Sequence, residues 1–419
     1  MKQRRSFLRG YSMVVHSFLM YWIYGTLIGG GLSVIVTQYC GMTGLDASAV
    51  TSVNTAGGFL SVVMTFFIGR WVMKHGVRAI TAFSCVGTAI GLCILGNGRT
   101  LGVYILWSAI SQGLYNGYSF TATNALIANW FPRKKDLVLG YVTMGSNLST
   151  ALCLYIIGFL LAKVSLTGTF LVWGVIYLVL GVLSFALLRD NPEELGEFPD
   201  NDRSLTQEQV QEQFRQGEEY RKNGGLTTGD ILKKRQSWQI AFGYGIILLI
   251  TVGILSTLVS TLIIKGLPEM NAISIMTIAA VLGIPFSYLW GYLGVKFSTK
   301  KATMLLYAVI FVMIAVMLIP GTWTAYVTAV LLGCFIGAGN NLTPAIIATV
   351  FGRYDFSKAL AVIMPIWNIV VAFATTVVGV PQSLTGSYVA AYIVLAVVAV
   401  IGFILVVTLD DRCIGREDA

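Results

Sequence analysis

The chain has 419 residues, of which 56% are hydrophobic and only 11% are charged, and its mean hydropathy is +0.77. Soluble domains carry about 25% charged residues, so this composition excludes a soluble protein and indicates an integral membrane protein. The net charge of +9 would suggest a nucleic-acid partner in a soluble chain, but here the basic residues stand in short loops between apolar segments. We therefore attribute the charge to membrane orientation and expect no nucleic-acid partner.

Apolar stretches follow one another along the whole chain. A helix needs about 20 apolar residues to cross the hydrocarbon core of a bilayer, and twelve stretches approach or exceed that length. We therefore predict an all-α membrane protein with twelve transmembrane helices. The predicted spans are residues 12–37, 47–72, 79–96, 101–129, 137–161, 169–188, 238–264, 271–295, 301–319, 323–350, 359–380 and 387–409.

The distribution of Lys and Arg predicts the orientation of these spans. An even number of spans places both termini on one side, and the loops of that side hold 25 of the 28 basic residues. The opposite side holds only Arg99, Lys163 and Lys265. Because positive loop charge resists translocation, we predict cytoplasmic termini in a multi-pass protein of a bacterial inner membrane. No small-residue cleavage site follows the basic start, so we expect the first span to be retained.

A polar segment divides the predicted spans into six and six. We predict an N-terminal six-helix half over residues 1–188, a cytoplasmic linker over residues 189–237 and a C-terminal six-helix half over residues 238–419. Within the linker, Val210 and Phe214 stand at helical spacing, which favours a surface helix on the cytoplasmic face. A partly ordered linker is the alternative.

The two halves are similar in sequence. Tyr24 recurs as Tyr244, and Phe131 recurs as Phe351 after an identical interval. The turns after the second and eighth spans, which begin at Gly69 and at Gly291, are separated by nearly the same interval. A nearly constant offset at three places indicates an internal repeat.

Two repeated six-helix halves resemble the major facilitator superfamily, whose substrate site lies at the midplane between the halves. Residues 69–78, GRWVMKHGVR, resemble the loop motif G-x-x-x-D-R-x-G-R of that family, although Met73 stands at the aspartate position and Val295 does so in the second half. The resemblance implies a cytoplasmic gate that holds the halves together when the outside is open. The expected gate residues are Gly69, Arg70, Lys74, Gly76, Arg78, Arg133, Lys296 and Arg353.

A basic turn and its second-half counterpart resemble one branch of this family. Residues 129–149, NWFPRKKDLVLGYVTMGSNLS, and the segment ATVFGRYDFSKALAVIMPIWN are similar to the monocarboxylate transporters and the bacterial oxalate:formate antiporters. The resemblance implies secondary transport of a small organic anion, of monocarboxylate or dicarboxylate type, by alternating access. Coupling would be to protons or to a counter-substrate. A uniporter or symporter of a neutral or amphipathic metabolite and a membrane sensor without transport are the alternatives.

No Asp, Glu, Lys or Arg lies within the predicted spans except at their ends. A bound carboxylate would therefore be held by hydrogen bonds and helix dipoles, which also gives weight to a neutral solute or a protonated acid. His16 is the proton-coupling candidate, because imidazole titrates near neutral pH; a packed, hydrogen-bonded histidine is the alternative. The substrate-binding candidates are polar and aromatic: Tyr21, Tyr24, Tyr115, Asn116, Tyr141, Asn341, Trp367 and Asn368.

The sequence contains no pattern typical of an enzyme, a metal site or a nucleotide-binding loop. The six cysteines show no C-x-x-C spacing, and no nucleophile and base or cluster of metal ligands stands out. The Gly-x-Gly spacings lack the strand and the lysine of a nucleotide-binding loop. We therefore expect no enzyme activity, no cofactor and no metal. The expected partners are a small-molecule solute and the lipid bilayer, with the monomer as the functional unit.

Overall fold

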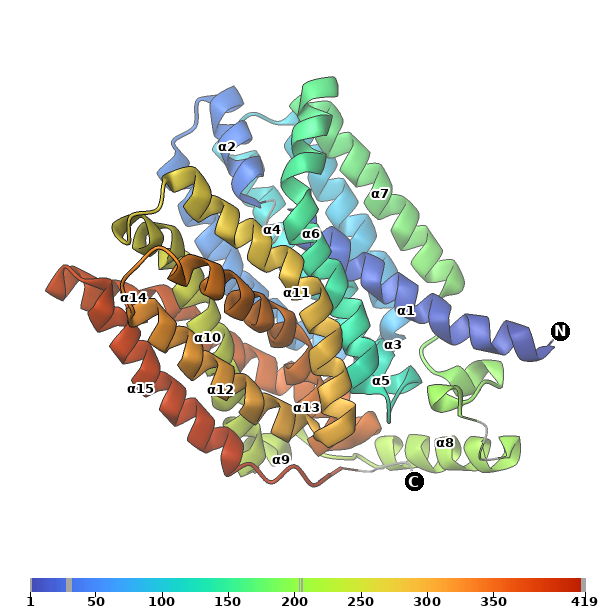
Figure 1. Cartoon of the computed structure of the whole chain (residues 1–419). Helices are drawn as coiled ribbons and strands as arrows, with labels where there is room; N and C mark the ends of the chain where they lie inside the picture. Colours follow the sequence, from blue (N-terminus) through green and yellow to red (C-terminus); the bar gives the residue numbers. More distant parts are fainter. Residues whose placement is uncertain (1, 28–31, 203, 205, 416–419) are drawn as a thin grey trace. The chain divides into compact units, whose positions relative to one another are not determined.

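The computed structural model describes residues 2–27, 32–202, 204 and 206–415, and over that range it consists of helices and loops without a strand. The predicted all-helical class is therefore confirmed for the described part of the chain (Figure 1). The chain divides into two compact units, each assembled from non-contiguous segments.

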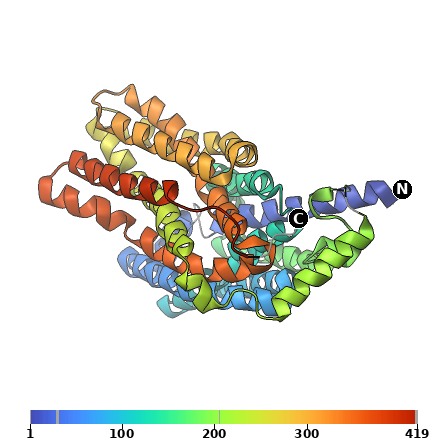
Figure 2. The ribbon, with the colours of Figure 1, turned by 90° about the horizontal axis from the view of Figure 1, so that it is seen from below.

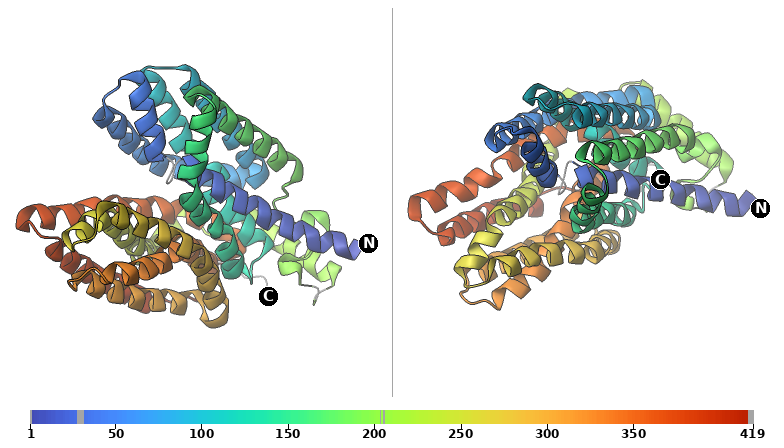
Figure 3. Two further views of the ribbon diagram at one scale, coloured as in Figure 1. Left: turned by 45° about the horizontal axis from the view of Figure 1, so that its top comes forward. Right: turned by 90° about the horizontal axis from the view of Figure 1, so that it is seen from above.

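The first unit combines Met1–Arg133, Leu148–Tyr220 and Phe356–Ala361. In it α3 packs on α4 and α7, and α1 packs on α5 (Figure 3). Its helices are α1 (Lys2–Leu27), α2 (Leu32–Thr43), α3 (Ala47–Asn97), α4 (Leu101–Tyr118), α5 (Phe120–Trp130), α7 (Leu166–Leu187), the 3-10 helices η1 (Pro192–Leu195) and η2 (Pro199–Asn201), and most of α8 (Gln207–Lys222).

The second unit combines Lys134–Asn147, Arg221–Asp355 and Val362–Ala419. In it α15 packs against α10, α12 and α14 (Figure 2). Its helices are α9 (Thr228–Lys233), α10 (Arg235–Ile264), α11 (Glu269–Phe297), α12 (Thr299–Leu318), α13 (Thr324–Ala372), α14 (Ala374–Thr385) and α15 (Tyr388–Val407). Helix α6 (Lys135–Lys163) begins in this unit and continues in the first.

Two helices are long enough to cross a membrane twice. Helix α3 has 51 residues and α13 has 49, whereas about 20 residues suffice for one crossing. Each is interrupted by a glycine with positive φ and extended ψ, Gly76 (φ 78, ψ 166) and Gly352 (φ 71, ψ 172). Residues other than glycine rarely adopt this backbone conformation, so each glycine separates two helical segments.

A similar break separates α11 from α12 at Ser298 (φ 115, ψ 152). The interval from Gly76 to Ser298 equals the interval that relates the turns at Gly69 and Gly291. The two loops of the proposed repeat thus share a backbone conformation as well as a sequence offset.

Within the described residues, seven helices are long and apolar enough to cross a membrane, or eight if the bent α6 counts as one span. The sequence predicts twelve spans. Part of the difference arises because Ala56–Asn97 and Thr324–Thr385 each count once, although each covers more than one predicted span. The predicted first span, 12–37, includes residues 28–31, which lie outside the described part of the chain. The number twelve and the cytoplasmic termini stay predictions.

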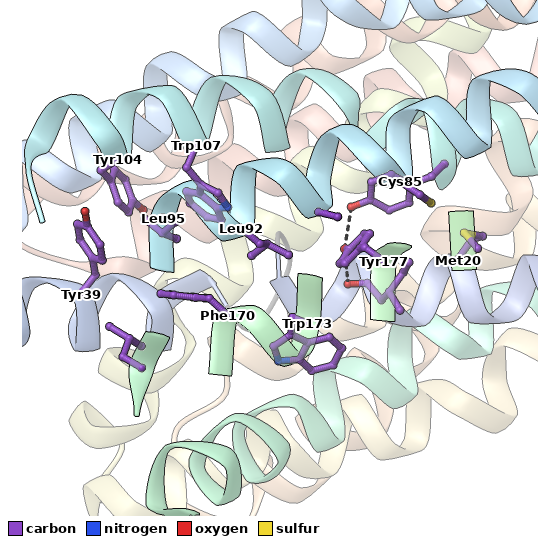
Figure 4. Close-up of a cluster of buried hydrophobic side chains, with 14 of the residues drawn as sticks. Met20, Tyr39, Cys85, Leu92, Leu95, Tyr104, Trp107, Phe170, Trp173 and Tyr177 are labelled. Carbon is purple, nitrogen blue, oxygen red and sulfur yellow. Dashed lines mark hydrogen bonds between the residues drawn. The ribbon is translucent and has the colours of Figure 1, made fainter. Parts of the chain in front are cut away.

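The core of the first unit is rich in aromatic side chains (Figure 4). Tyr177 on α7 donates a hydrogen bond to the carbonyl of Ile23 on α1, with an O···O distance of 3.2 Å. Tyr118 then donates to the Tyr177 hydroxyl at 3.0 Å. Both rings are fully buried, and buried hydroxyls need such partners. This pair of bonds therefore fixes α1 relative to α4 and α7.

The predicted linker contains helix α8, as the spacing of Val210 and Phe214 favours. Val210 is buried, and Gln211 donates a hydrogen bond to the carbonyl of Glu193 in η1 at 3.0 Å. Just after η1, Glu197 forms an ion pair of 3.3 Å with Arg9 of α1. The first part of the linker is thus folded onto the first unit.

Candidate functional site

A buried polar seam lies between α1 and α5 in the first unit. Tyr21 donates a hydrogen bond to Asn124 Oδ1 at 3.1 Å, and both side chains are buried. Among the described residues, Asn124 Nδ2, Ser17 Oγ and Thr121 Oγ1 have no hydrogen-bond partner. Unused hydrogen-bonding groups in a membrane helix are costly, so this seam has free capacity for a polar solute or for water.

The other candidates of the first unit lie on α1 and α4. The rings of Tyr24 and Tyr115 stack with centroids 5.2 Å apart. Asn116, the next residue, points toward α3 instead, where its Nδ2 donates to Thr65 Oγ1 at 2.8 Å. The structure therefore brings Tyr24 and Tyr115 together. Asn116 instead links α4 to α3 by a hydrogen bond.

A second polar cluster lies among α6, α11 and α13 in the second unit. Asn341 Nδ2 donates to the carbonyl of Ser287 at 3.0 Å, while its Oδ1 has no partner among the described residues. Asn147 Nδ2 donates to Ser287 Oγ at 2.7 Å and to the carbonyl of Gly283 at 3.0 Å. Only Asn341 was a sequence candidate. The repeat contained a signal for Asn147, because the interval from Asn147 to Asn368 nearly equals the offset between the two halves.

The remaining candidates of the second unit do not join this cluster through a described contact. Tyr141 is 43% exposed and contacts Tyr288, with ring centroids 5.1 Å apart. Trp367 is buried beside Gly245, where a Cβ would come within 3.4 Å of the Trp367 ring. Asn368 is half-buried. Tyr141 therefore lies on an exposed aromatic surface rather than in a buried polar cluster.

His16 joins α1 to α7. Its Nε2 lies 2.7 Å from Ser184 Oγ, and the Ser184 hydroxyl lies 2.6 Å from the carbonyl of Leu180. Because that carbonyl can only accept, Ser184 donates to it, and His16 Nε2 donates to Ser184. His16 Nδ1 is then an unprotonated acceptor, buried and without a partner in the described chain.

Lys265, a basic residue of the predicted outer loops, is held by neutral acceptors. Its Nζ donates to the carbonyl of Ile319 at 2.8 Å, to the carbonyl of Val316 at 3.3 Å and to Thr324 Oγ1 at 3.2 Å. Burial lowers the pKa of Lys265. All three N–H donors of the ammonium group are occupied. Lys265 therefore caps the C-terminal end of α12 and is not a free site for an anion.

The expected gate residues of the loop after the first part of α3 find partners within the first unit. Gly69 lies against Ala361 of α13, and Gly76 lies against Asp190, so neither position has room for a side chain. The backbone N–H of Arg78 donates to Asp190 Oδ1 at 3.0 Å, and the Arg78 guanidinium lies 4.3 Å from the centre of the Phe185 ring. This loop is therefore fixed to the end of α7.

Cations of the other expected gate positions lie over aromatic rings or bind acids. The guanidinium of Arg70 lies 4.3 Å from the Phe66 ring centre, and that of Arg353 lies 5.7 Å from the Tyr354 ring centre. Lys296 Nζ lies 5.8 Å from the Tyr292 ring centre. The Arg133 backbone N–H donates to Asp200 at 3.0 Å, and its side chain lies 3.5 Å from Asp202. Lys74 is exposed.

Neighbouring helices in the second unit cross on glycines. A Cβ on Gly140 of α6 would lie 2.7 Å from the carbonyl oxygen of Ser287, and one on Gly291 of α11 would lie 3.1 Å from Leu137 Cα. Among the described residues, no group of three or more His, Cys, Asp or Glu side chains is arranged to hold a metal ion. The second polar cluster therefore lies beside a tight crossing of α6 and α11.

The model of the Major Facilitator Superfamily matches residues 13–297 and 266–416, which is most of the chain. The chain belongs to the Major Facilitator Superfamily. Two solved structures of this fold are similar along nearly their whole length. The fucose:proton symporter FucP of E. coli aligns with a TM-score of 0.68 and 13% identity over 96% of this chain and 98% of that one. The proton:xylose symporter XylE aligns with a TM-score of 0.72 and 14% identity over 96% of both.

Curated relatives match shorter segments. The uncharacterized MFS-type transporter YhjX of Escherichia coli (strain K12) is 27% identical over 153 residues, which are 36% of this chain and 38% of that protein. The putative glycerol-3-phosphate transporter 1 of Arabidopsis thaliana is 26% identical over 140 residues, 31% of this chain and 26% of that protein. The matched segments thus span well under half of these relatives. The comparisons support the superfamily and leave the monocarboxylate branch a prediction.

Proposed function

We propose that this protein is a secondary active transporter that moves a small organic anion, of monocarboxylate or dicarboxylate type, across a bacterial inner membrane by alternating access. Membership of the superfamily supports transport. We further propose twelve spans in two six-helix halves, cytoplasmic termini and a functional monomer. The anion class rests on the resemblance of residues 129–149 and their second-half counterpart to the monocarboxylate branch. The observation that supports a hydrogen-bonded solute of either class is the pair of uncharged polar seams, Tyr21 with Asn124 and Asn341 with Ser287.

The two polar seams contain no charged side chain among the residues that the structure describes, and this favours coupling to protons over exchange. In the described helices, Tyr21, Asn124 and Asn341 supply hydrogen bonds but no positive charge. An anion that leaves water without a cationic partner pays a large desolvation penalty, and a proton taken up with the solute removes it. We therefore propose that the solute crosses as the neutral acid, so that uptake is electroneutral.

A neutral polar solute is the second candidate. It is favoured by the same uncharged seams, in which Asn124 Nδ2 is an unused donor and Asn341 Oδ1 an unused acceptor within the described part of the chain. Both solute classes would use Tyr24 and Tyr115 as a stacking surface. The two classes differ in one respect, because only an acid requires a proton for charge balance.

Counterflow in proteoliposomes tests these proposals. A thermal-shift screen of carboxylates and their uncharged amides first finds solutes that bind, since ligands of the folded state raise its stability. Labelled solute is then exchanged into loaded vesicles. We expect counterflow of a carboxylate. We also expect net uptake into unloaded vesicles to acidify their interior, because each neutral acid that enters releases its proton there. Counterflow confined to neutral solutes would favour the second candidate, and binding without counterflow would indicate a sensor.

His16 is the proposed proton-coupling residue, and Nδ1 is the atom that would take the proton, because Nε2 already donates to Ser184. We expect His16→Gln to change the pH dependence of solute uptake while its amide preserves a donor to Ser184. Uptake is measured between about pH 5 and about pH 8, the range in which histidine titrates. An unchanged pH profile in this variant would reduce His16 to a packing residue.

A further inference from the structure

Asp136 is a buried acid in the first turn of α6, directly after the basic turn and ahead of the predicted span 137–161. Its side chain is only 6% exposed. The hydroxyl of Thr299, the first residue of α12, donates to Asp136 Oδ1 at 2.6 Å. An ionisable carboxyl group at the start of α6 is therefore hydrogen-bonded to the first residue of α12, directly after the turn that joins α11 to α12.

The surrounding backbone is shaped to admit this carboxyl group. A Cβ on Gly294 would lie 2.6 Å from Asp136 Oδ1 and 3.0 Å from Asp136 Cγ. One turn earlier, Gly291 lies directly against the backbone of Asp136 and Leu137. Any side chain at either glycine would force α6 away from α11. The same two glycines thus allow both the close contact of α6 with α11 and the burial of Asp136.

We propose that Asp136 is a positioning residue of the transport cycle: its side chain takes up a proton when the first turn of α6 packs on the α11–α12 turn, and releases it when that contact opens. The inference rests on the proposed transport function. The Asp136 carboxylate binds one proton and becomes the neutral acid. Water on the side of the basic turns supplies this proton when the contact forms and receives it when the contact opens. Because it enters and leaves on one side, this proton is not counted among those moved with solute.

The charged groups around Asp136 only partly offset its burial. Burial raises the pKa of the Asp136 carboxyl, while Lys135 and the Thr299 hydroxyl lower it. On the neighbouring elements, Lys296 of α11 lies over the Tyr292 ring, and Lys300 of α12 donates to the carbonyl of Leu409. On α10, the Tyr244 hydroxyl lies 3.1 Å from Thr303 Oγ1 of α12.

The sign of the pH effect follows from linkage. A carboxyl whose pKa is higher in the packed state than in water binds its proton more tightly there. The packed contact is therefore most stable below the usual pKa of aspartate. It loses stability as the pH rises through the raised pKa. Low pH on the side of the basic turns should hold α6 against α11 and α12, and high pH should release it.

Hydrogen–deuterium exchange of the full-length protein in lipid nanodiscs tests this inference without any solute. Backbone protection reports local opening, and it is compared at about pH 5 and about pH 8 after correction for the intrinsic rate. In peptides covering residues 135–147 and 291–303, we expect higher protection at low pH, by up to about tenfold for each unit by which the pKa differs between the two states. Equal protection at both pH values would overturn the inference.

The variants separate protonation from packing. Asp136→Asn is neutral and still accepts from Thr299, so we expect it to show at both pH values the protection that the wild type reaches at low pH. Thr299→Val removes a donor to the carboxylate and should move the midpoint of the pH effect upward. Glu269→Gln neutralises an exposed acid at the other end of α11 and should leave the effect unchanged. A pH effect that persists in Asp136→Asn would contradict the proposal.

The outcome is also separable from that of the transport proposal. Wild-type protein that shows no counterflow but retains pH-dependent protection would refute the proposed function and leave the proton-binding contact in place. Counterflow with pH-independent protection would refute the role of Asp136 alone.

Discussion

The two basic turns that the repeat relates are built differently. The first turn ends α5 at Phe131 (φ −133, ψ 59), and α6 begins afresh at Lys135. The second turn lies within α13, which is interrupted only by the positive φ of Gly352. Each turn is followed by a buried acid, Asp136 or Asp355. Equivalent sequence positions therefore give one loop and one hinge-like break, depending on whether proline or glycine follows the phenylalanine.

The acids after the two turns also have different partners. Asp136 accepts from Thr299 in the α11–α12 turn, whereas Asp355 accepts from the backbone N–H of Leu226 at 3.0 Å. The carboxyl-terminal segment lies beside the second turn, where the N–H of Ile414 donates to the carbonyl of Val350 at 2.8 Å. The first turn therefore contacts two membrane helices, α11 and α12. The second turn contacts the linker and the carboxyl-terminal segment.

The largest expected effect concerns the glycine contacts associated with the two turns. A Cβ on Gly291 would meet the backbone of α6, whereas one on Gly69 would meet the Ala361 side chain. We expect Gly291→Ala to lower the free energy of unfolding by about 1–3 kcal/mol through overpacking. No second substitution can relieve this clash, because the new Cβ meets backbone atoms. Gly69→Ala should be equally damaging alone but should be rescued by Ala361→Gly.

Thermal unfolding of the purified variants in one detergent measures this contrast. A Gly291→Ala protein as stable as the wild type would show that α6 and α11 can separate without loss. The same result for Gly69→Ala would show that the Ala361 contact is loose.

A smaller loss of stability, because only one hydrogen bond is removed, is expected at the acid of the second turn. Asp355→Ala removes the carboxylate that accepts from the partly buried Leu226 N–H, and a typical hydrogen bond contributes about 0.5–1.5 kcal/mol. Hydrogen–deuterium exchange should therefore increase around Leu226 and α9 and stay unchanged in the first turn of α6. Asp136→Asn provides the opposite pattern in the same assay. Increased exchange around Leu226 in both variants would mean that the two turns are not independent.

The smallest contrast concerns the residues after the two phenylalanines. Gly352→Ala places a side chain at φ 71 and ψ 172, a strained conformation that costs about 1–3 kcal/mol. Pro132→Ala should change stability by less than about 1 kcal/mol, because alanine adopts the φ of proline freely. Denaturation midpoints of both variants test the difference. Equal losses would contradict the assignment of the α13 break to glycine geometry.

The sequence predicts the fold class well because the physical signal is strong and local. Long apolar stretches can only be satisfied as helices in lipid, and the offset between Gly69 and Gly291 predicts two similar halves. The polar candidates are predicted less well. Tyr24 and Tyr115 do meet, but Tyr141 lies on an exposed surface, and Asn124, Asn147 and Ser287 were missed.

By itself the sequence determined the helical membrane class and the superfamily pattern, because hydrophobic length and the placement of Lys and Arg act on each segment separately. Only the tertiary structure decided which polar groups meet. Helical periodicity says which residues share a face, but not which neighbouring helix that face contacts. The pairing of Asp136 with Thr299, far apart in the sequence, therefore had no local signal. It depends on the close approach of α6 to α11 that Gly291 and Gly294 allow.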